Sequence, residues 1–289
     1  MTKFKNGDRV QLSDAKGNKK TVVLAEGSSF HTHKGYIPHA DIIGLDDGSL
    51  VTATSGTQYL AIRPLLLDHV LSMPRGAAVI YPRDSASIIV EADIFPGAVV
   101  VEAGVGSGGL SSYLLRAIGN NGLLYSFERR EDFAETARKN VAAFLEETPK
   151  NWEVRVGDLQ QENLADDLFG KVDRIVLDML APWECIKTAF NLLKPGGVLC
   201  IYVATTTQMS RTAETIKILD TWTPVRAYEL LTRGWHLEGL SVRPEHRMVG
   251  HTGFLMTTRR MADGFQPLIK RSKPAHGAYG EDWTPPEID

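Results

Sequence analysis

A glycine-rich segment, residues 102–110 (EAGVGSGGL), follows a strongly apolar stretch and precedes a segment with helical spacing. Glycine lets the backbone turn sharply and come within contact distance of a ligand, and a helix start offers unpaired N–H groups. These features predict a loop that holds a cofactor. Gly104, Gly106 and Gly109 fit the G-x-G-x-x-G dinucleotide pattern, whereas Gly108 also completes a G-x-G-x-G pattern typical of methyltransferases. The loop alone therefore leaves the cofactor open, and a tight turn without a ligand is the alternative.

Two carboxylates follow the next expected strands. Glu128 ends the strand at 123–128, where a carboxylate can accept both ribose hydroxyls of an adenosyl group, in NAD and in S-adenosylmethionine alike. Asp158 follows the strand at 152–157, where it can accept from an adenine amino group while Leu159 packs on the ring. A lone aspartate at such a place is otherwise a turn residue or a helix cap.

The order of elements favours one of the two cofactors. Between residues 98 and 203, apolar strands alternate with segments whose apolar residues recur at three- and four-residue spacing, which predicts βαβ units on a parallel sheet. The last two strands, 225–231 and 253–260, have no helix between them and are expected to pair antiparallel. This arrangement is an α/β fold, the class I S-adenosylmethionine methyltransferase fold. That fold is Rossmann-like and has a seven-stranded sheet with a terminal antiparallel hairpin. Dinucleotide-binding domains do not end in such a hairpin. The expected parallel strands are 98–103, 123–128, 152–157, 172–178 and 197–203, and the expected helices are 109–118, 130–147, 182–193 and 208–220.

Four parts are expected along the chain. Residues 1–64 hold short alternating strands separated by turn signals such as AKGNKK, which predict a small N-terminal β domain. Residues 65–97 form a helical connector that runs from LLLDHVLSM to the IYPRD segment, and residues 98–260 form the catalytic domain. Residues 261–289, with prolines at 285 and 286, are expected to be a C-terminal tail.

The composition is that of an ordinary soluble globular protein, because 43% of the 289 residues are hydrophobic and 23% are charged. The apolar runs are far short of the roughly 20 residues that span a bilayer, so we expect a cytoplasmic protein without a membrane segment. Cys185 and Cys200 lie in apolar stretches without metal-ligand spacing, which predicts buried thiols and no metal site. The formal charge of -3 indicates that a nucleic-acid partner would meet a local patch or a surface built from several subunits.

Several longer motifs carry a resemblance to a known family. They are IYPRD at 80–84, LDMLAPW at 177–183, YVAT at 202–205 and RMVGHT at 247–252. With the glycine loop, they resemble the class I tRNA (adenine-N1)-methyltransferases that modify adenine 58 of the T-loop, especially the actinobacterial members. The resemblance covers nearly the whole chain. One departure is Arg83, because relatives often have lysine there, which keeps the charge but changes the hydrogen-bond geometry.

The resemblance implies S-adenosyl-L-methionine as the cofactor, tRNA as the substrate and a homotetramer whose tRNA grooves span subunits. Glu128 would take the ribose hydroxyls, Phe133 would line the adenosine pocket, and Asp158 and Leu159 would hold the adenine. Asp178 falls on the family's catalytic aspartate and is also counted with the cofactor-binding residues. The loop residues that would surround the methionyl and ribose parts are Gly104, Gly106, Ser107, Gly108, Gly109 and Leu110, and the target-base pocket would be walled by Tyr81, Trp183 and Tyr202, although buried aromatic residues are commonly core.

The implied chemistry is an in-line displacement at the methyl carbon, which depends on positioning. The N1 atom of adenine has a lone pair and needs no base, but its attack puts positive charge on the ring, which the Asp178 carboxylate would stabilise. Its alternative role is a cap for the helix that starts near Pro182. The base must leave its stack to reach the pocket, and recognition should depend largely on tRNA shape.

Other functions stay open at this stage. One is a methyltransferase for adenine N6 or a protein carboxyl group, although the compact Asp-Pro-Pro-aromatic motif of N6 enzymes is missing, since three residues separate Asp178 from Pro182. Another is an inactive RNA-binding partner subunit, which would be expected to lose the glycine loop or the aspartate, and this chain retains both. A nicotinamide oxidoreductase is the third. The sequence does not say whether a neighbouring adenine is also methylated, which tRNAs are preferred or what residues 261–289 contribute.

Overall fold

The computed structural model describes residues 3–145, 147–161 and 164–268. Its contacts divide the chain into two compact units, Met1–Met73 and Pro74–Asp289, each described by itself below. The first unit includes α1 (Leu66–Ser72), which the sequence analysis assigned to a connector beginning at residue 65. The predicted boundary after residue 64 stays a prediction. The predicted tail falls mostly on residues 269–289, which lie outside the described residues.

The first unit is the predicted small β domain. Four antiparallel strands form a sheet in the order β2-β1-β6-β5, and β3 and β4 form a separate hairpin followed by a short 3-10 helix, His39–Asp41. Its core is a cluster of apolar side chains that includes Phe4, Leu12 and Ile37. The strands are β1 (Arg9–Ser13), β2 (Lys19–Val23), β3 (Ser29–Thr32), β4 (Gly35–Pro38), β5 (Ser49–Thr52) and β6 (Gln58–Ile62).

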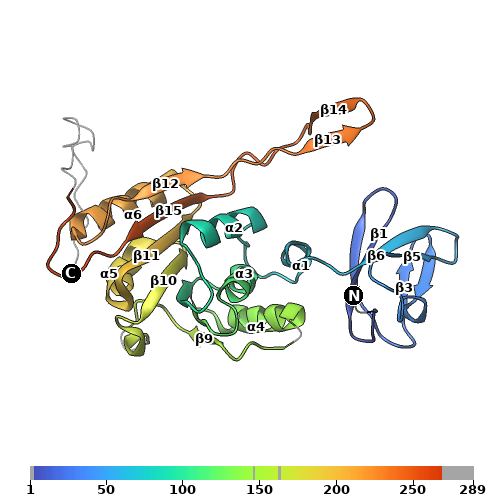
Figure 1. Cartoon of the computed structure of the whole chain (residues 1–289), viewed down its shortest axis with the longest axis horizontal. Coiled ribbons are helices and arrows are strands. Elements are labelled where there is room, and N and C mark those ends of the chain that lie inside the picture. Colours follow the sequence, from blue (N-terminus) through green and yellow to red (C-terminus); the bar gives the residue numbers. More distant parts are fainter. Residues whose placement is uncertain (1–2, 146, 162–163, 269–289) are drawn as a thin grey trace. The chain divides into compact units, whose positions relative to one another are not determined.

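The second unit is built on the predicted seven-stranded sheet, in the order β12-β15-β11-β10-β7-β8-β9 (Figure 1). Five strands are parallel, and β15 pairs antiparallel with both β11 and β12, as the missing helix between the last two strands predicted. The strands are β7 (Val99–Ala103), β8 (Leu123–Glu128), β9 (Trp152–Val156), β10 (Val172–Asp178), β11 (Leu193–Val203), β12 (Arg226–Glu229) and β15 (Phe254–Arg259). In this strand order β7, β10 and β11 are central. Because they are parallel neighbours, their carboxyl ends meet at one edge of the sheet.

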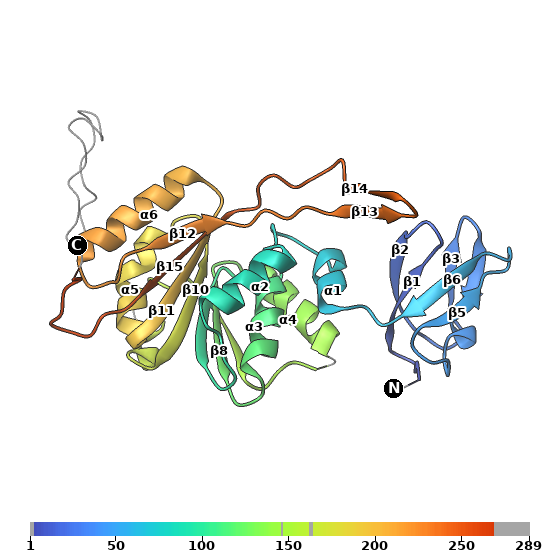
Figure 2. The same cartoon turned by 45° about the horizontal axis from the view of Figure 1, so that its top comes forward.

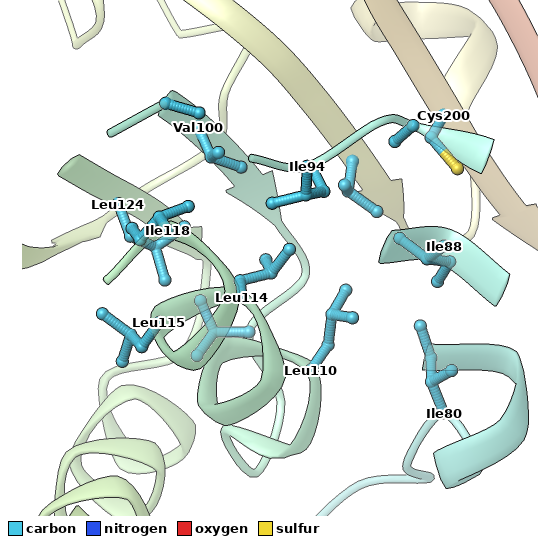
Figure 3. Close-up of a cluster of buried hydrophobic side chains, with 14 of the residues drawn as sticks. Ile80, Ile88, Ile94, Val100, Leu110, Leu114, Leu115, Ile118, Leu124 and Cys200 are labelled. Atoms are coloured by element: carbon cyan, nitrogen blue, oxygen red, sulfur yellow. The ribbon is translucent and has the colours of Figure 1, made fainter. Parts of the chain in front are cut away.

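Helices cover both faces of this sheet (Figure 2). One face packs against α2, α3 and α4 through a cluster that includes Ile88, Leu114 and Val141, part of which is drawn in Figure 3. The other face packs against α5 and α6 through a cluster that includes Ile186 and Ile216. The helices are α2 (Pro82–Glu91), α3 (Gly109–Ile118), α4 (Glu131–Leu145), α5 (Ile186–Leu192) and α6 (Thr206–Leu219).

Three local features differ from the sequence expectations. The helix α2 lies in the segment 82–91 of the expected connector, where Pro82 occupies the first helical turn, a position that proline favours. The expected helix at 182–193 is a short 3-10 turn, Pro182–Cys185, followed by α5, and β11 begins at Leu193 rather than at residue 197. The segment between the last two expected strands, for which no element was expected, contains a hairpin of β13 (Trp235–Glu238) and β14 (Ser241–Pro244).

Candidate active site

A cavity of about 760 Å³ opens at the carboxyl ends of the parallel strands. Its walls come from the segment before α2, from the turns after β7, β8, β9, β10 and β11, and from the segment before β15. A ligand bound there would touch every loop that the sequence analysis selected. The lining includes Ala77, Ala78, Val79, Ile80, Tyr81, Gly104, Gly106, Glu128, Arg129, Phe133, Asp158, Leu159, Asp178, Leu180, Ala181, Tyr202, Ala204, Gln208 and Thr252.

The glycines of the loop after β7 serve different purposes. Gly104 has a φ of +97°, and a Cβ atom there would lie 1.8 Å from the carbonyl oxygen of Asp178, so only glycine lets β7 and the end of β10 approach so closely. Gly108 has a φ of +80°, and its Cβ would meet the backbone of Ala137 at 3.1 Å. A Cβ at Gly106 would find only Ala77 and Ala78, at 3.7 and 3.9 Å. Gly104 and Gly108 are therefore required by the protein's own packing, whereas Gly106 leaves space that a ligand can use.

Residues 107–110 of the glycine loop do not line the cavity, and they pack against the protein interior instead. Ser107 is buried, and its backbone carbonyl accepts from the Asn140 amide of α4 at 2.9 Å. Its hydroxyl has no hydrogen-bond partner among the described residues. Gly109 begins α3, and the Leu110 side chain packs in the core with Ile80 and Ile88 (Figure 3). Any contact of Leu110 with a cofactor would therefore involve its backbone.

Glu128, at the end of β8, joins the glycine loop to the next turn. One carboxylate oxygen accepts from the backbone N–H of Gly106 at 3.0 Å, and the other accepts from that of Arg130 at 3.1 Å. These bonds fix a carboxylate in the cavity wall with capacity left to accept hydroxyl donors. Phe133 also lines the cavity, and the Arg130 guanidinium stacks on its ring at 3.8 Å from the centroid.

Asp158 and Leu159, which follow β9, line the cavity as well. Leu159 is fully buried and packs in the cluster on the α5 and α6 face. Asp158 forms an ion pair with Arg129, a cavity residue that the sequence analysis missed. A carboxylate with this partner still has lone pairs for an amino donor, so the contact leaves the expected adenine role open.

Asp178 ends β10 and also lines the cavity. Burial, and secondly the negative charge of Glu128, raise the pKa of Asp178 from its usual value to about 7. Its backbone lies against Gly104, just after β7, and is in register with Tyr202 on β11. The N-cap residue of the 3-10 turn at Pro182–Cys185 is Ala181, so Asp178 does not occupy the cap position of that turn. The geometry thus places a poorly solvated carboxyl group where three central strands meet.

The three aromatic residues expected around a target base are placed differently. Tyr202 lines the cavity, and its hydroxyl donates to the carboxylate of Asp84 on α2 at 3.3 Å. A Cβ at Gly253 would lie 2.3 Å from the Tyr202 ring, so this glycine lets the backbone before β15 pack directly on the ring. Tyr81 lines the cavity with about half of its surface exposed. Trp183 does not line the cavity: it lies beneath the guanidinium of Arg211 on α6, 4.2 Å from the ring centroid.

Sequence reasoning missed several cavity residues, among them Gln208 and Thr252. The signal for Gln208 was present, because Thr205-x-x-Gln208 has the spacing of a helix capping box. Glu102 on β7, just before the glycine loop, is a buried titratable group that the sequence did not point to. It is fully buried and accepts from the hydroxyls of Ser111 and Ser126 at 2.7 Å, and its burial raises its pKa to about 7.

Within the described residues, no group of histidine, cysteine or acidic side chains is arranged to hold a metal ion. Both cysteines are free and buried. No helix in the described part of the chain is long and apolar enough to cross a membrane.

Comparison with known proteins connects this site to one family. The model of the tRNA methyltransferase complex GCD14 subunit family matches residues 59–242, and a TrmI-like N-terminal model matches residues 3–51. The tRNA (adenine(58)-N(1))-methyltransferase TrmI of Thermus thermophilus is 34% identical over 252 residues, which are 86% of this chain and 95% of that protein. A Methanocaldococcus jannaschii TrmI, named for adenines 57 and 58, is 29% identical and covers 86% of this chain and 93% of its own.

Solved structures agree in fold. The tRNA (m1A58) methyltransferase TrmI of Aquifex aeolicus superposes with a TM-score of 0.78 at 25% identity, covering 90% of this chain and all of that one. A Thermotoga maritima structure titled as an S-adenosylmethionine-dependent O-methyltransferase gives a TM-score of 0.84 at 28% identity and covers 91% of this chain and 96% of that one. These two proteins are named for methylation of different atoms, so the target has to be argued from the site. The family model matches most of the chain, and the Thermus relative is 34% identical over nearly all of its length. The chain therefore belongs to the GCD14/TrmI family of tRNA methyltransferases.

Proposed function

We propose that this protein transfers a methyl group from S-adenosylmethionine to N1 of adenine 58 in tRNA. The observation that carries the proposal is that one cavity is lined both by the Glu128 carboxylate, which suits an adenosyl group, and by Asp178 and Tyr202, which lie in register on neighbouring strands. Relatives that share most of the chain's length are named for this reaction. The enzyme would act where tRNA is found, in the cytoplasm.

The residues of the cavity fit the cofactor. The Glu128 carboxylate is held by two backbone N–H groups and can accept from a ribose diol, and the space at Gly106 admits a ligand close to the backbone. Asp158 and Leu159 offer an acceptor and an apolar surface for adenine. When bound, S-adenosylmethionine supplies a methyl group on a positively charged sulfur. The role of the protein is to hold the acceptor in line with that methyl group.

Asp178 would act on the adenine ring. N1 attacks through its own lone pair, and positive charge then spreads to the exocyclic amino group, where a carboxylate can accept a hydrogen bond and offset the charge. In a poorly solvated place this electrostatic contribution is larger than in water. Tyr81 and Tyr202 would form the walls around the flipped base. Trp183 would stabilise the turn after β10 against α6, outside the cavity.

A homotetramer is part of the proposal. The chain carries a net charge of -3, so a continuous basic surface for RNA would have to be assembled from local patches of several subunits. The β13–β14 hairpin supports self-association, because it exposes Trp235, Leu237, Leu240 and Val242, each more than half accessible.

The experiment that tests the function is a methylation assay. Unmodified tRNA transcript is incubated with the protein and S-adenosylmethionine labelled in its methyl group, and the modified nucleoside and its position are identified. The expected product is 1-methyladenosine at position 58, absent from a transcript with uridine at that position. A labelled N6-methyladenosine, or label only in protein carboxyl esters, would overturn the proposal.

A further inference from the structure

Gln208, in the first turn of α6, is bonded at both ends of its side chain. Its carbonyl oxygen accepts from the backbone N–H groups of Ala204 and Thr205 at 3.2 and 3.0 Å, and from the Thr205 hydroxyl at 3.0 Å. Its amide nitrogen donates to the backbone carbonyl of Leu180 at 2.9 Å. The side chain therefore connects the turn after β10, which carries Asp178, to the turn after β11, which carries Tyr202.

The orientation of this amide is fixed by its surroundings. Backbone N–H donors face one end, and a carbonyl acceptor faces the other, so the reverse orientation would set donor against donor and oxygen against oxygen. The first set of bonds is an ordinary capping box with Thr205. The bond to Leu180 is not part of a helix cap, and it is the one that needs an amide rather than a carboxylate.

This bond is one of the contacts that hold the turn after Asp178. The side chain of Leu180 is 82% exposed and adds little packing, whereas Met179 in the same turn is partly buried against the apolar cluster on the α5 and α6 face. On the other side, Ala204 is held at both of its backbone groups, since its carbonyl faces the Nε2 atom of His251 at 2.9 Å while its N–H binds Gln208. Gln208 thus ties the backbone of the exposed Leu180 to the firmly held Ala204, and it does so in the wall of the cavity.

We propose that Gln208 is a positioning residue for methyl transfer, which sets Asp178 against the target base by tethering the turn at Leu180 to the turn at Ala204. This inference rests on the proposed function of Asp178. Small displacements of a catalytic group reduce rates steeply, on the order of a hundredfold for 1 Å.

The substitution Gln208→Glu separates the two roles of the side chain. Glutamate is a normal partner in a capping box and suits a helix N-terminus, so α6 keeps its cap. Its second oxygen would face the Leu180 carbonyl without a hydrogen, so the tether is lost. We expect a small fall in melting temperature from the lost bond to Leu180, an unchanged affinity for S-adenosylhomocysteine, and a single-turnover rate at saturating tRNA that falls about tenfold or more.

Two further variants complete the test. Gln208→Met removes both roles without adding charge, and should be as slow as Gln208→Glu. Thr205→Ala removes the cap hydroxyl but keeps the tether, so the melting temperature should fall by about 2–4 °C while the rate stays at the wild-type value. A wild-type rate in Gln208→Met, or in Gln208→Glu, would overturn the inference. Wild-type protein that fails to methylate tRNA at all would instead overturn the proposed function.

Discussion

Asp178 is a carboxyl group whose surroundings oppose its charge. Burial at the junction of β7, β10 and β11, with the neighbouring charge of Glu128, raises its pKa to about 7. A group that must offset positive charge on a methylated ring has to be ionised, so the same burial that strengthens its electrostatic effect also limits the pH range in which it acts.

A pH dependence follows from this pKa. The ionised fraction of Asp178 increases as pH rises through about 7, so the wild-type single-turnover rate should rise between pH 6 and 8 and then level off. The measurement is a rate profile at saturating tRNA and S-adenosylmethionine. Asp178→Asn has no carboxyl group to ionise and should lack this rise. A wild-type rate that does not change between pH 6 and 8 would contradict a dependence of methyl transfer on the ionisation of Asp178.

Substitutions at Gly106 and at Gly104 should have different effects, the first on cofactor binding and the second on stability. A valine at Gly106 puts its side chain where the backbone must approach a ligand, and the φ of +54° adds strain of about 1 kcal/mol or more. We expect Gly106→Val to remain folded and to lose S-adenosylhomocysteine binding, measured by titration calorimetry. At Gly104, even alanine collides with the Asp178 backbone, so Gly104→Ala should unfold at markedly lower temperature. Equal affinity in Gly106→Val and wild type would contradict the assignment of the loop.

At the level of elements, the sequence predicted what local periodicity encodes. The five parallel strands and the antiparallel pair of β12 and β15 were recognisable because most of these strands are rich in apolar residues and the connections differ in helical content. The hairpin of β13 and β14 was missed because its strands are only four residues long and largely exposed. The placement of Trp183 outside the cavity could not be predicted, since it depends on Arg211 of α6, a contact between separate elements.

Glu102 links three elements and has a testable consequence for stability. It sits on β7 and accepts from Ser111 of α3 and Ser126 of β8, and its pKa of about 7, against the usual 4.5, corresponds to a cost on the order of 3 kcal/mol when it ionises. Because the folded state holds the proton more tightly than the unfolded state, this group removes stability as pH rises from about 4.5 to 7. Glu102→Gln cannot ionise. Its melting temperature relative to wild type should therefore increase between pH 5 and pH 8, and a constant difference would contradict the buried charge.

At the scale of the whole molecule, a net-acidic chain with a proposed RNA substrate requires an assembled binding surface. Replacing Leu237 on β13 by aspartate puts a charge into the exposed apolar hairpin, so we expect a smaller particle by light scattering. The same variant should lose tRNA in a gel shift while it keeps S-adenosylhomocysteine binding, because the cofactor residues lie within one chain. Leu50→Asp, at an exposed leucine of β5, is the matched control. Tight tRNA binding by a monomer would contradict the assembly.

The central claim is that the charge of Asp178 accelerates methyl transfer to adenine N1, and one measurement tests it most directly. Wild type and Asp178→Asn are saturated with S-adenosylmethionine and unmodified tRNA, and formation of 1-methyladenosine at position 58 is followed in a single turnover. Asparagine keeps the size of the side chain and can accept a hydrogen bond, but cannot offset positive charge. The account predicts a similar melting temperature, similar cofactor binding and a rate lower by on the order of a hundredfold or more. Wild-type rates in Asp178→Asn would contradict it and leave Asp178 as a structural residue.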